Sequence, residues 1–315
     1  MNIKDKLIKF QYENHIGLVG AGLIGLSWAG LFSAFGYQTI VYDPYLTKPK
    51  KALQAIDDIW ASLDLLFENL HNKKEVKLTN KMADLKFSTF IQENCPEDLQ
   101  LKQKIILELE KIVSDKTVIA SSTSSFLPSE LQKSCIQPER IIVGHPMNPP
   151  HLIPLVELVL GKVSSQEIAS RATSFYNSLN RIPVQIKKEM RGHLANRLTS
   201  ALYREAVYLI SEGIADVEDV DAVISNGPGL RLALLGPHMN YHLGGGSGGY
   251  RYYLDHLGPS QEERWKTLGQ ASLTPELKEK LIRGIESQNI NFSELKIKRD
   301  KSLIEILKTK KANKL

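Results

Sequence analysis

The first 190 residues alternate between short apolar runs and longer segments with helical periodicity. Runs rich in β-branched and aromatic residues predict strands, and apolar residues spaced three or four apart predict amphipathic helices. The predicted strands are residues 15–19, 38–42, 87–91, 117–121, 141–144, 155–160 and 183–186. The predicted helices are residues 23–35, 48–69, 99–113, 128–132 and 168–179. Strands that alternate with helices predict an α/β fold with a doubly wound, mostly parallel sheet.

The pattern changes after about residue 190, where no strand is evident. The helices expected in this part are residues 195–213, 217–224 and 275–288. We therefore expect an N-terminal α/β domain over residues 1–189 and an all-α C-terminal domain over residues 190–315. Residues 244–249 contain five glycines in six positions. This run predicts either a flexible turn or a loop that lets a ligand approach the backbone.

Composition and charge narrow the class of protein. Hydrophobic residues make up 42% and charged residues 24% of the 315 residues, which is typical of a globular chain rather than a disordered or fibrous one. The net charge is only +5, and eight of the last 20 residues are Lys or Arg against two acids. We expect a frayed basic tail there. A nucleic-acid partner is not expected, because no aromatic side chains accompany these charges.

Residues 16–42 carry no charge over a length that could cross a membrane. Six glycines interrupt this stretch at spacings typical of turns and helix packing, so a membrane segment is not expected. The two cysteines, Cys95 and Cys135, are too few for a metal site or a disulfide framework. They fit a reducing compartment, and we expect the cytoplasm.

A glycine-rich motif follows the first predicted strand and opens the first predicted helix. Residues 20–25, GAGLIG, match the pattern G-x-G-x-x-G. Gly20 permits the tight turn, Gly22 lets the backbone approach a pyrophosphate, and Gly25 lets the helix pack against the strand. The helix begins at Leu23 and Ile24, whose N–H groups can bind phosphate oxygens. The motif therefore predicts a dinucleotide site.

Asp43 ends the second predicted strand. At this position an acid accepts hydrogen bonds from the ribose hydroxyls of a dinucleotide and repels a 2′-phosphate. We therefore expect NAD rather than NADP as the cofactor. The alternatives are a glycine-rich turn without a ligand, and FAD.

His145 and Glu157 form a candidate catalytic pair. His145 directly follows a predicted strand, where ligands bind in open α/β sheets. Glu157 lies within the apolar run 155–160 and needs a partner if it is buried. If the four prolines between the two residues turn the chain back, the carboxylate can orient the imidazole and raise its basicity. The alternative is an unrelated histidine at a strand end and an exposed glutamate on an edge strand.

Two further polar groups have open interpretations. Residues 121–125, SSTSS, follow a predicted strand and either cap a helix or bind a substrate oxygen. Asn196 lies at the start of the first helix of the second domain, where it either caps the helix, forms an interface or binds substrate.

Six motifs in order along the chain resemble the L-3-hydroxyacyl-CoA dehydrogenase superfamily. They are residues 20–25 with Asp43, 93–99 (ENCPEDL), 121–125 (SSTSS), 145–150 (HPMNPP), 155–157 (LVE) and 192–198 (GHLANRL). The resemblance covers about residues 15–285. It implies a Rossmann-type NAD-binding domain, followed by a helical domain that contacts substrate and forms a homodimer.

The resemblance also implies a role for each matching residue. His145 would be the general base that takes the proton of the 3-hydroxyl, and Glu157 would orient His145 and stabilise the imidazolium. Ser124 and Asn196 would hydrogen-bond the reacting oxygen of the substrate.

Glu97 and Lys102 match positions near the nicotinamide and its ribose. Within the superfamily the chain resembles two branches that act on short substrates. Residues 145–150 and 153–159 are similar to the L-gulonate 3-dehydrogenases and lambda-crystallin. The segments that are similar to the L-carnitine dehydrogenases are residues 201–206, 227–231 and 241–251.

The resemblance implies an NAD-dependent dehydrogenase of a small L-3-hydroxy acid, with L-carnitine or a similar compound as the expected substrate. The alternatives are L-gulonate, a short 3-hydroxyacyl-CoA such as 3-hydroxybutyryl-CoA, and a crystallin-like NAD-binding structural protein. No metal is expected. A group of aromatic side chains either contacts a trimethylammonium group or packs in a subunit interface. These are Tyr241, Tyr250, Tyr252, Tyr253 and Trp265.

Overall fold

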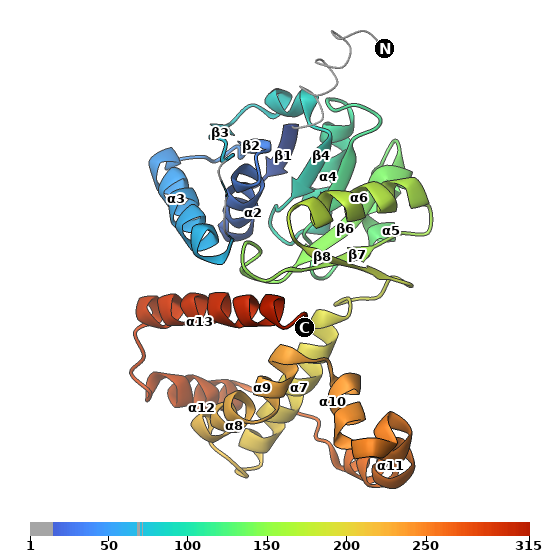
Figure 1. Ribbon diagram of the computed structural model, residues 1–315. Helices are drawn as coiled ribbons and strands as arrows, with labels where there is room; N and C mark the ends of the chain where they lie inside the picture. Colours follow the sequence, from blue (N-terminus) through green and yellow to red (C-terminus); the bar gives the residue numbers. More distant parts are fainter. Residues whose placement is uncertain (1–14, 68–69, 71) are drawn as a thin grey trace. The chain divides into compact units, whose positions relative to one another are not determined.

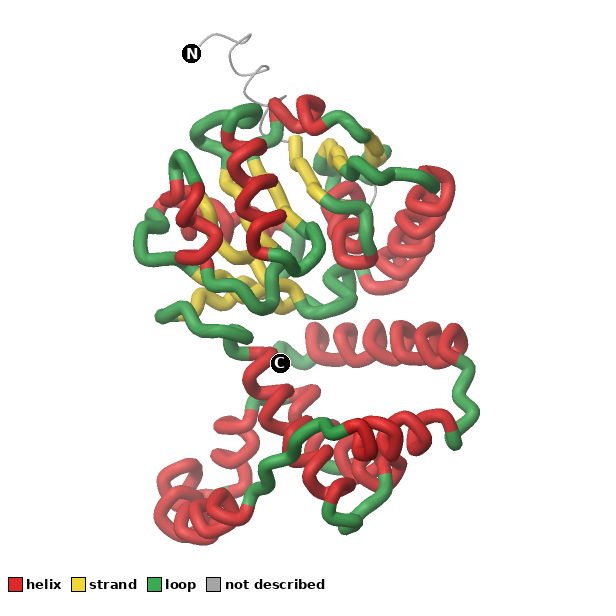
Figure 2. The backbone as a smooth tube through the Cα atoms, turned by 180° about the vertical axis from the view of Figure 1, so that it is seen from behind, coloured by secondary structure: helices red, strands yellow, loops and turns green. Residues whose placement is uncertain are grey.

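The computed structural model describes residues 15–67, 70 and 72–315. It divides into two compact units, the first ending at Asn196 and the second spanning Arg197–Leu315. Figure 2 shows the strands gathered in one sheet and the second unit built from helices.

The first unit is built on an eight-stranded sheet in the order β3-β2-β1-β4-β5-β6-β7-β8 (Figure 1). Only the pair β6–β7 is antiparallel, so the expected doubly wound, mostly parallel sheet is confirmed. The strands are β1 (His15–Val19), β2 (Gln38–Tyr42), β3 (Val76–Thr79), β4 (Phe90–Glu93), β5 (Val118–Ser121), β6 (Ile141–Pro146), β7 (Leu155–Val159) and β8 (Ile182–Ile186).

Helices cover both faces of the sheet. Successive strand residues point to opposite faces, so Phe90 packs in one buried cluster and Ile91 in the other. The first cluster contains residues of α2 (Leu23–Ala34), α3 (Pro49–Leu66) and α6 (Gln166–Ser178). The second contains residues of α4 (Leu99–Glu110) and α5 (Pro128–Leu131). This packing leaves the ends of the strands for the functional residues.

The sequence-based prediction was wrong in several places in the first unit. Strand β3 was not expected, because a four-residue strand gives only a weak alternation. The strand expected at 87–91 begins at Phe90, because residues Met82–Phe87 form a 3₁₀ helix. The helix expected at 48–69 ends at Leu66, and residues 68–69 lie outside the described part of the chain. His145 lies within β6 rather than after it, because β6 extends to Pro146 by pairing with β7.

The second unit is helical in its described residues, as expected. Its helices are most of α7 (Ala195–Ser211), then α8 (Val217–Asn226), α9 (Pro228–Leu234), α10 (Pro237–Gly244), α11 (Gly249–Thr267), α12 (Pro275–Glu286) and α13 (Phe292–Ala312). The expected frayed basic tail was wrong, because α13 is a regular helix of 21 residues. The glycine run forms a short 3₁₀ turn, Gly246–Gly248, between α10 and α11. No helix among the described residues is long and apolar enough to span a membrane.

Candidate active site

Four neighbouring strands end at the same edge of the sheet. The register aligns Val19 with Glu93, Glu93 with Ser121, and Ser121 with Val143. The segments that follow these residues carry the glycine motif, Glu97, the serine-rich residues and His145. The sheet therefore brings four of the predicted motifs to one edge, where ligands bind in open α/β sheets.

The glycine motif has the geometry of a phosphate cradle. Gly20 has a φ of +95°, which an L side chain rarely adopts. A Cβ on Gly25 would lie 2.0 Å from the carbonyl oxygen of Gly20, so this turn and α2 approach each other too closely for any side chain. A Cβ on Gly22 would meet nothing within 4 Å and would project into open space at the helix N-terminus. That space, next to the N–H groups of Leu23 and Ile24, suits an anionic pyrophosphate.

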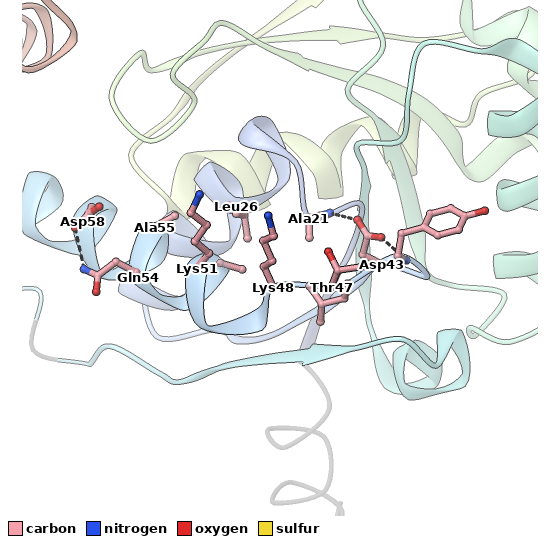
Figure 3. Close-up of a pocket in the computed structure, with 12 residues that line it drawn as sticks. Ala21, Leu26, Asp43, Thr47, Lys48, Lys51, Gln54, Ala55 and Asp58 are labelled. Carbon is pink, nitrogen blue, oxygen red and sulfur yellow. Dashed lines mark hydrogen bonds between the residues drawn. The ribbon is translucent and has the colours of Figure 1, made fainter. Parts of the chain in front are cut away.

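Asp43 lies beside this cradle, at the end of β2. Its carboxylate accepts hydrogen bonds from the N–H of Ala21 and the N–H of Tyr45, both at 2.8 Å (Figure 3). It lines a cavity of about 510 Å³ between the segment that follows β2 and helix α3. Two cations that the sequence analysis did not single out, Lys48 and Lys51, line the same cavity. The donors, the open space at Gly22 and Asp43 together fit a dinucleotide such as NAD.

His145 and Glu157 face each other directly across the antiparallel pair β6–β7. The imidazole Nδ1 lies 2.8 Å from the carboxylate Oε2. Both side chains are buried, with His145 5% and Glu157 2% exposed. Because the carboxylate accepts, Nδ1 carries the proton, and Nε2 of a neutral imidazole is left as a base.

Glu157 is also held from its other side. Its Oε1 accepts hydrogen bonds from the N–H of Leu194 at 2.8 Å and of Ala195 at 2.9 Å, at the start of α7. Burial acts to raise the pKa of this carboxyl. The hydrogen bonds from His145 and from the two N–H groups outweigh it and hold the pKa below its ordinary value. The carboxylate is thus ionised and oriented before any substrate arrives.

The serine-rich residues are held in place by Glu97. Its Oε1 accepts from the hydroxyl of Thr123 at 2.5 Å and from the N–H groups of Ser124 and Ser125 at 3.1 and 3.0 Å. Burial acts to raise the Glu97 pKa, but the hydrogen bonds and the charge of Lys102 hold the pKa below its ordinary value. Ser124 therefore sits in a turn whose backbone is fixed by an ionised carboxylate.

Lys102 is buried beneath the same segment, with 1% of its surface exposed. Its ammonium lies 2.9 Å from Glu93 Oε1, 3.0 Å from the carbonyl of Cys95 and 3.4 Å from Glu97 Oε2. The structure thus uses the charge of Lys102 to support residues 93–97.

Asn196 lies in the first turn of α7, directly after the N–H groups that hold Glu157.

In the second unit, Tyr241 and Tyr253 stack with ring centroids 4.4 Å apart, and Tyr250 lies parallel to Tyr253 at 6.1 Å. Their ring faces are directed at one another, which favours a packing role for these three tyrosines over a cation site.

His193 lies within the motif at residues 192–198, but the sequence predicts no role for it. It is fully buried, and its ring centroid lies 5.2 Å from that of His145. Its Nε2 lies 3.1 Å from the carbonyl oxygen of Thr123. No sequence pattern indicates this position, because the contact joins segments 70 residues apart.

Family models match both parts of the chain. Residues 15–190 match the 3-hydroxyacyl-CoA dehydrogenase NAD binding domain, and residues 192–287 match the 3-hydroxyacyl-CoA dehydrogenase C-terminal domain.

Curated relatives match over nearly the full length. An L-carnitine dehydrogenase of Bacillus cereus is 40% identical, over 93% of this chain and 91% of the relative. One of Oceanobacillus iheyensis is 38% identical, over 93% and 96%.

Solved structures share the fold. A 5-formyl-3-hydroxy-2-methylpyridine 4-carboxylic acid 5-dehydrogenase superimposes with a TM-score of 0.77 at 23% identity, covering 93% of this chain and 97% of that one. The 3-hydroxyacyl-CoA dehydrogenase of Archaeoglobus fulgidus has a TM-score of 0.63 at 25% identity, covering 93% and 98%.

Proposed function

The chain belongs to the 3-hydroxyacyl-CoA dehydrogenase family and is an NAD-dependent dehydrogenase, and we propose that it oxidises the 3-hydroxyl of L-carnitine or a closely similar small L-3-hydroxy acid. The observation that supports L-carnitine as the substrate is the series of L-carnitine dehydrogenases that are between 33% and 40% identical to this chain. The pairing of a buried His–Glu dyad with a dinucleotide cradle at one sheet edge supports the reaction class.

The dyad suits removal of a hydroxyl proton. In the proposed mechanism, Nε2 of His145 takes the proton of the 3-hydroxyl, while Glu157 keeps Nδ1 protonated and stabilises the imidazolium. Ser124 and Asn196 hydrogen-bond the reacting oxygen and orient it toward His145. Gly20, Gly22, Gly25, Leu23, Ile24 and Asp43 bind the dinucleotide, and Glu97 and Lys102 fix the segment nearest the nicotinamide. NAD, when bound, supplies the hydride acceptor.

We also propose a role for each domain, an oligomeric state and a cellular compartment. We assign NAD binding to residues 1–189, and substrate contacts and dimerisation to residues 190–315. Exposed apolar side chains on α7 support a homodimer, since Leu198 is 67% and Leu202 47% exposed. The two free cysteines support a cytoplasmic location.

A substrate panel tests the proposal. The purified enzyme with NAD is offered L-carnitine, D-carnitine, L-gulonate and 3-hydroxybutyryl-CoA, and NADH is followed by absorbance. L-carnitine should give a kcat/KM at least about tenfold above each of the others. A higher value for L-gulonate or the acyl-CoA would replace the substrate and keep the reaction class. No NADH with any acid would favour a non-catalytic, crystallin-like protein.

A further inference from the structure

We propose that His193 is a positioning residue of the active site, a neutral imidazole that ties the turn carrying Ser124 to the segment that holds Glu157. This inference rests on the proposed function, because it assigns Ser124 and Glu157 to one reaction. His193 itself takes no part in the proton transfer of the proposed mechanism.

The protonation of His193 follows from its hydrogen bond. A backbone carbonyl can only accept, so the Nε2 that lies 3.1 Å from Thr123 O must carry a proton. The other nitrogen, Nδ1, is buried and has no hydrogen-bond partner among the described residues. A proton on Nδ1 would be an unsatisfied buried donor, so the neutral form protonated on Nε2 is favoured.

The surrounding charges agree with this form. Burial lowers the pKa of His193, and the neighbouring His145 on β6 lowers it further. The hydrogen bond to Thr123, the carboxylate of Glu157 on β7 and the nearby backbone of Met190 act in the opposite direction and do not reverse the shift. His193 thus stays uncharged when His145 accepts a proton.

The position of His193 in the chain makes it a tether between two parts of the site. On one side it binds Thr123, whose hydroxyl and following N–H groups are held by Glu97. On the other side, the next two residues, Leu194 and Ala195, donate their N–H groups to Glu157. One side chain therefore fixes the distance between the oxygen-binding turn and the dyad.

The backbone at His193 has an unusual conformation that suits this role. His193 has a φ of +48° and follows Gly192, whose φ is +75°. A residue other than glycine is uncommon in this region and is retained where surrounding interactions hold it. The turn directs the imidazole to Thr123 while the next N–H groups reach Glu157.

Three substitutions at His193 separate the tether from mere filling of space. His193→Phe keeps the ring volume and removes the donor. His193→Gln places an amide N–H at about the reach of Nε2. His193→Asn tolerates the left-handed backbone but is too short to reach Thr123. The first measurement is the kcat/KM of the full-length enzyme for L-carnitine, together with the dissociation constant of NAD.

The tether predicts that His193→Phe and His193→Asn lose about tenfold in kcat/KM, with the loss mainly in kcat and with NAD binding unchanged. His193→Gln should recover to within about threefold of the wild type. If His193→Phe does not fold, the comparison of Gln with Asn decides. Equal losses in Gln and Asn, or a wild-type rate in Phe or Asn, would overturn the proposal.

A second measurement needs no substrate and separates this proposal from the proposed function. Hydrogen exchange of the peptide spanning residues 121–127 should be faster in His193→Phe and His193→Asn than in the wild type, and near normal in His193→Gln. If the wild type oxidises no acid, the function fails while the exchange result still decides the tether. Unchanged exchange in Phe and Asn would overturn it.

Discussion

Glu157 is the residue on which the candidate site depends most. Its two oxygens are used separately, one for His145 and one for the N–H groups of Leu194 and Ala195. A buried carboxylate needs such partners, because burial alone disfavours its charge. The same interactions that stabilise this charge orient the imidazole, so the fold and the proposed chemistry share one set of contacts.

His145→Asn should lower the rate of oxidation at least about a hundredfold, because the proton of the hydroxyl loses its acceptor. NAD affinity should be unchanged. Because His145 is buried within β6, we expect a loss of about 1–3 kcal/mol in the free energy of unfolding. Steady-state kinetics and urea unfolding measure both, and a folded variant with a near-normal rate would contradict the mechanism.

Glu157→Gln should lose turnover by at least about a hundredfold while keeping its NADH affinity. The Gln oxygen can still accept from Leu194 and Ala195, but its amide N–H would donate to His145 Nδ1. The imidazole proton then moves to Nε2, and the base is lost. A variant with wild-type kcat would show that Glu157 is only structural.

The same variant should differ from the wild type in its response to acid. The folded-state pKa of Glu157 is lowered, so its contribution to stability is fully present above the ordinary value of 4.5 and is lost as the pH falls through the folded-state pKa. The difference in unfolding free energy between the wild type and Glu157→Gln should therefore shrink below pH 4.5. Urea unfolding at neutral and acidic pH measures it, and a constant difference would count against the lowered pKa.

Asp43 should set the preference for NAD over NADP. Wild-type enzyme should bind NAD at least about tenfold more tightly, because a 2′-phosphate would face this carboxylate. Asp43→Asn should reduce the difference between the affinities for NAD and NADP, since the cations Lys48 and Lys51 line the same cavity. Asp58→Asn removes an equal charge from another wall of the cavity and serves as the control. Both dissociation constants are measured at one salt concentration, and equal values in the wild type would refute this role.

At the scale of elements, two glycines near the tight contact between the glycine turn and α2 have different roles. Substitution of Gly22 should affect NAD binding, and substitution of Gly25 should affect the stability of the fold. Gly22→Ala should fold normally, because a Cβ there meets nothing within 4 Å and the backbone φ is −76°. It should nevertheless weaken NAD binding about tenfold or more, since the methyl group occupies the space of the pyrophosphate.

Gly25→Ala is the matched change in the same turn. Its Cβ would lie 2.0 Å from the Gly20 carbonyl, so α2 must move. We expect a loss of about 1–3 kcal/mol in unfolding free energy. Thermal melts and NAD titrations of both variants test the contrast, and a destabilised Gly22→Ala would contradict it.

The sequence predicts elements well where the apolar pattern is long and regular. Strands β1 and β2 have the predicted bounds. β1 is an almost continuous buried apolar run, and β2 is rich in β-branched and aromatic residues. Strand β3 and helices α9 and α10 are short, so no period stands out. Lys77 interrupts β3, and α9 and α10 each contain one proline and one glycine. Helix α13 is rich in lysine, and its amphipathic pattern is correspondingly weak.

The candidate site is predictable only as far as its motifs are local. The glycine turn with Asp43 follows from strand, turn and acid in sequence. The contact of Glu157 with His145 depends on the register of β6 and β7, which a proline-rich connection does not reveal. The N–H groups of Leu194 and Ala195 and the tether from His193 join distant segments. Such contacts arise from packing and leave no spacing to detect.

At the scale of the whole molecule, most of the large exposed apolar side chains belong to the second unit, whereas the residues of the proposed chemistry belong to the first. The residues from Gly20 to Asn196 that we assign to cofactor, proton transfer and substrate oxygen lie in the first unit. The second unit carries exposed side chains on α7 and α11, including Leu198, Leu254 and Trp265. Large exposed apolar groups of this kind are typical of a surface that binds another chain.

Sedimentation analysis should therefore give about twice the mass of one 35.4 kDa chain. Replacing Leu198 and Leu202 together by Glu should shift the protein to monomers, because charges would enter the apolar contact. Ser200→Glu, an exposed position on the same helix, is the control and should leave the dimer intact. A monomeric wild type would refute the dimer.

The antiparallel pairing of β6 and β7 also governs how this chain can diverge in evolution. His145 and Glu157 are opposite each other in the ladder, and a slip of one residue moves every side chain of a strand to the other face. An insertion inside β7 would thus abolish the dyad in a single event, whereas length changes confined to residues 147–154 can spare it. Descendants of this protein should either inherit the pair intact or lack it entirely. An inactive descendant would be recognised by a residue added or lost between positions 155 and 157, even where its histidine and glutamate survive.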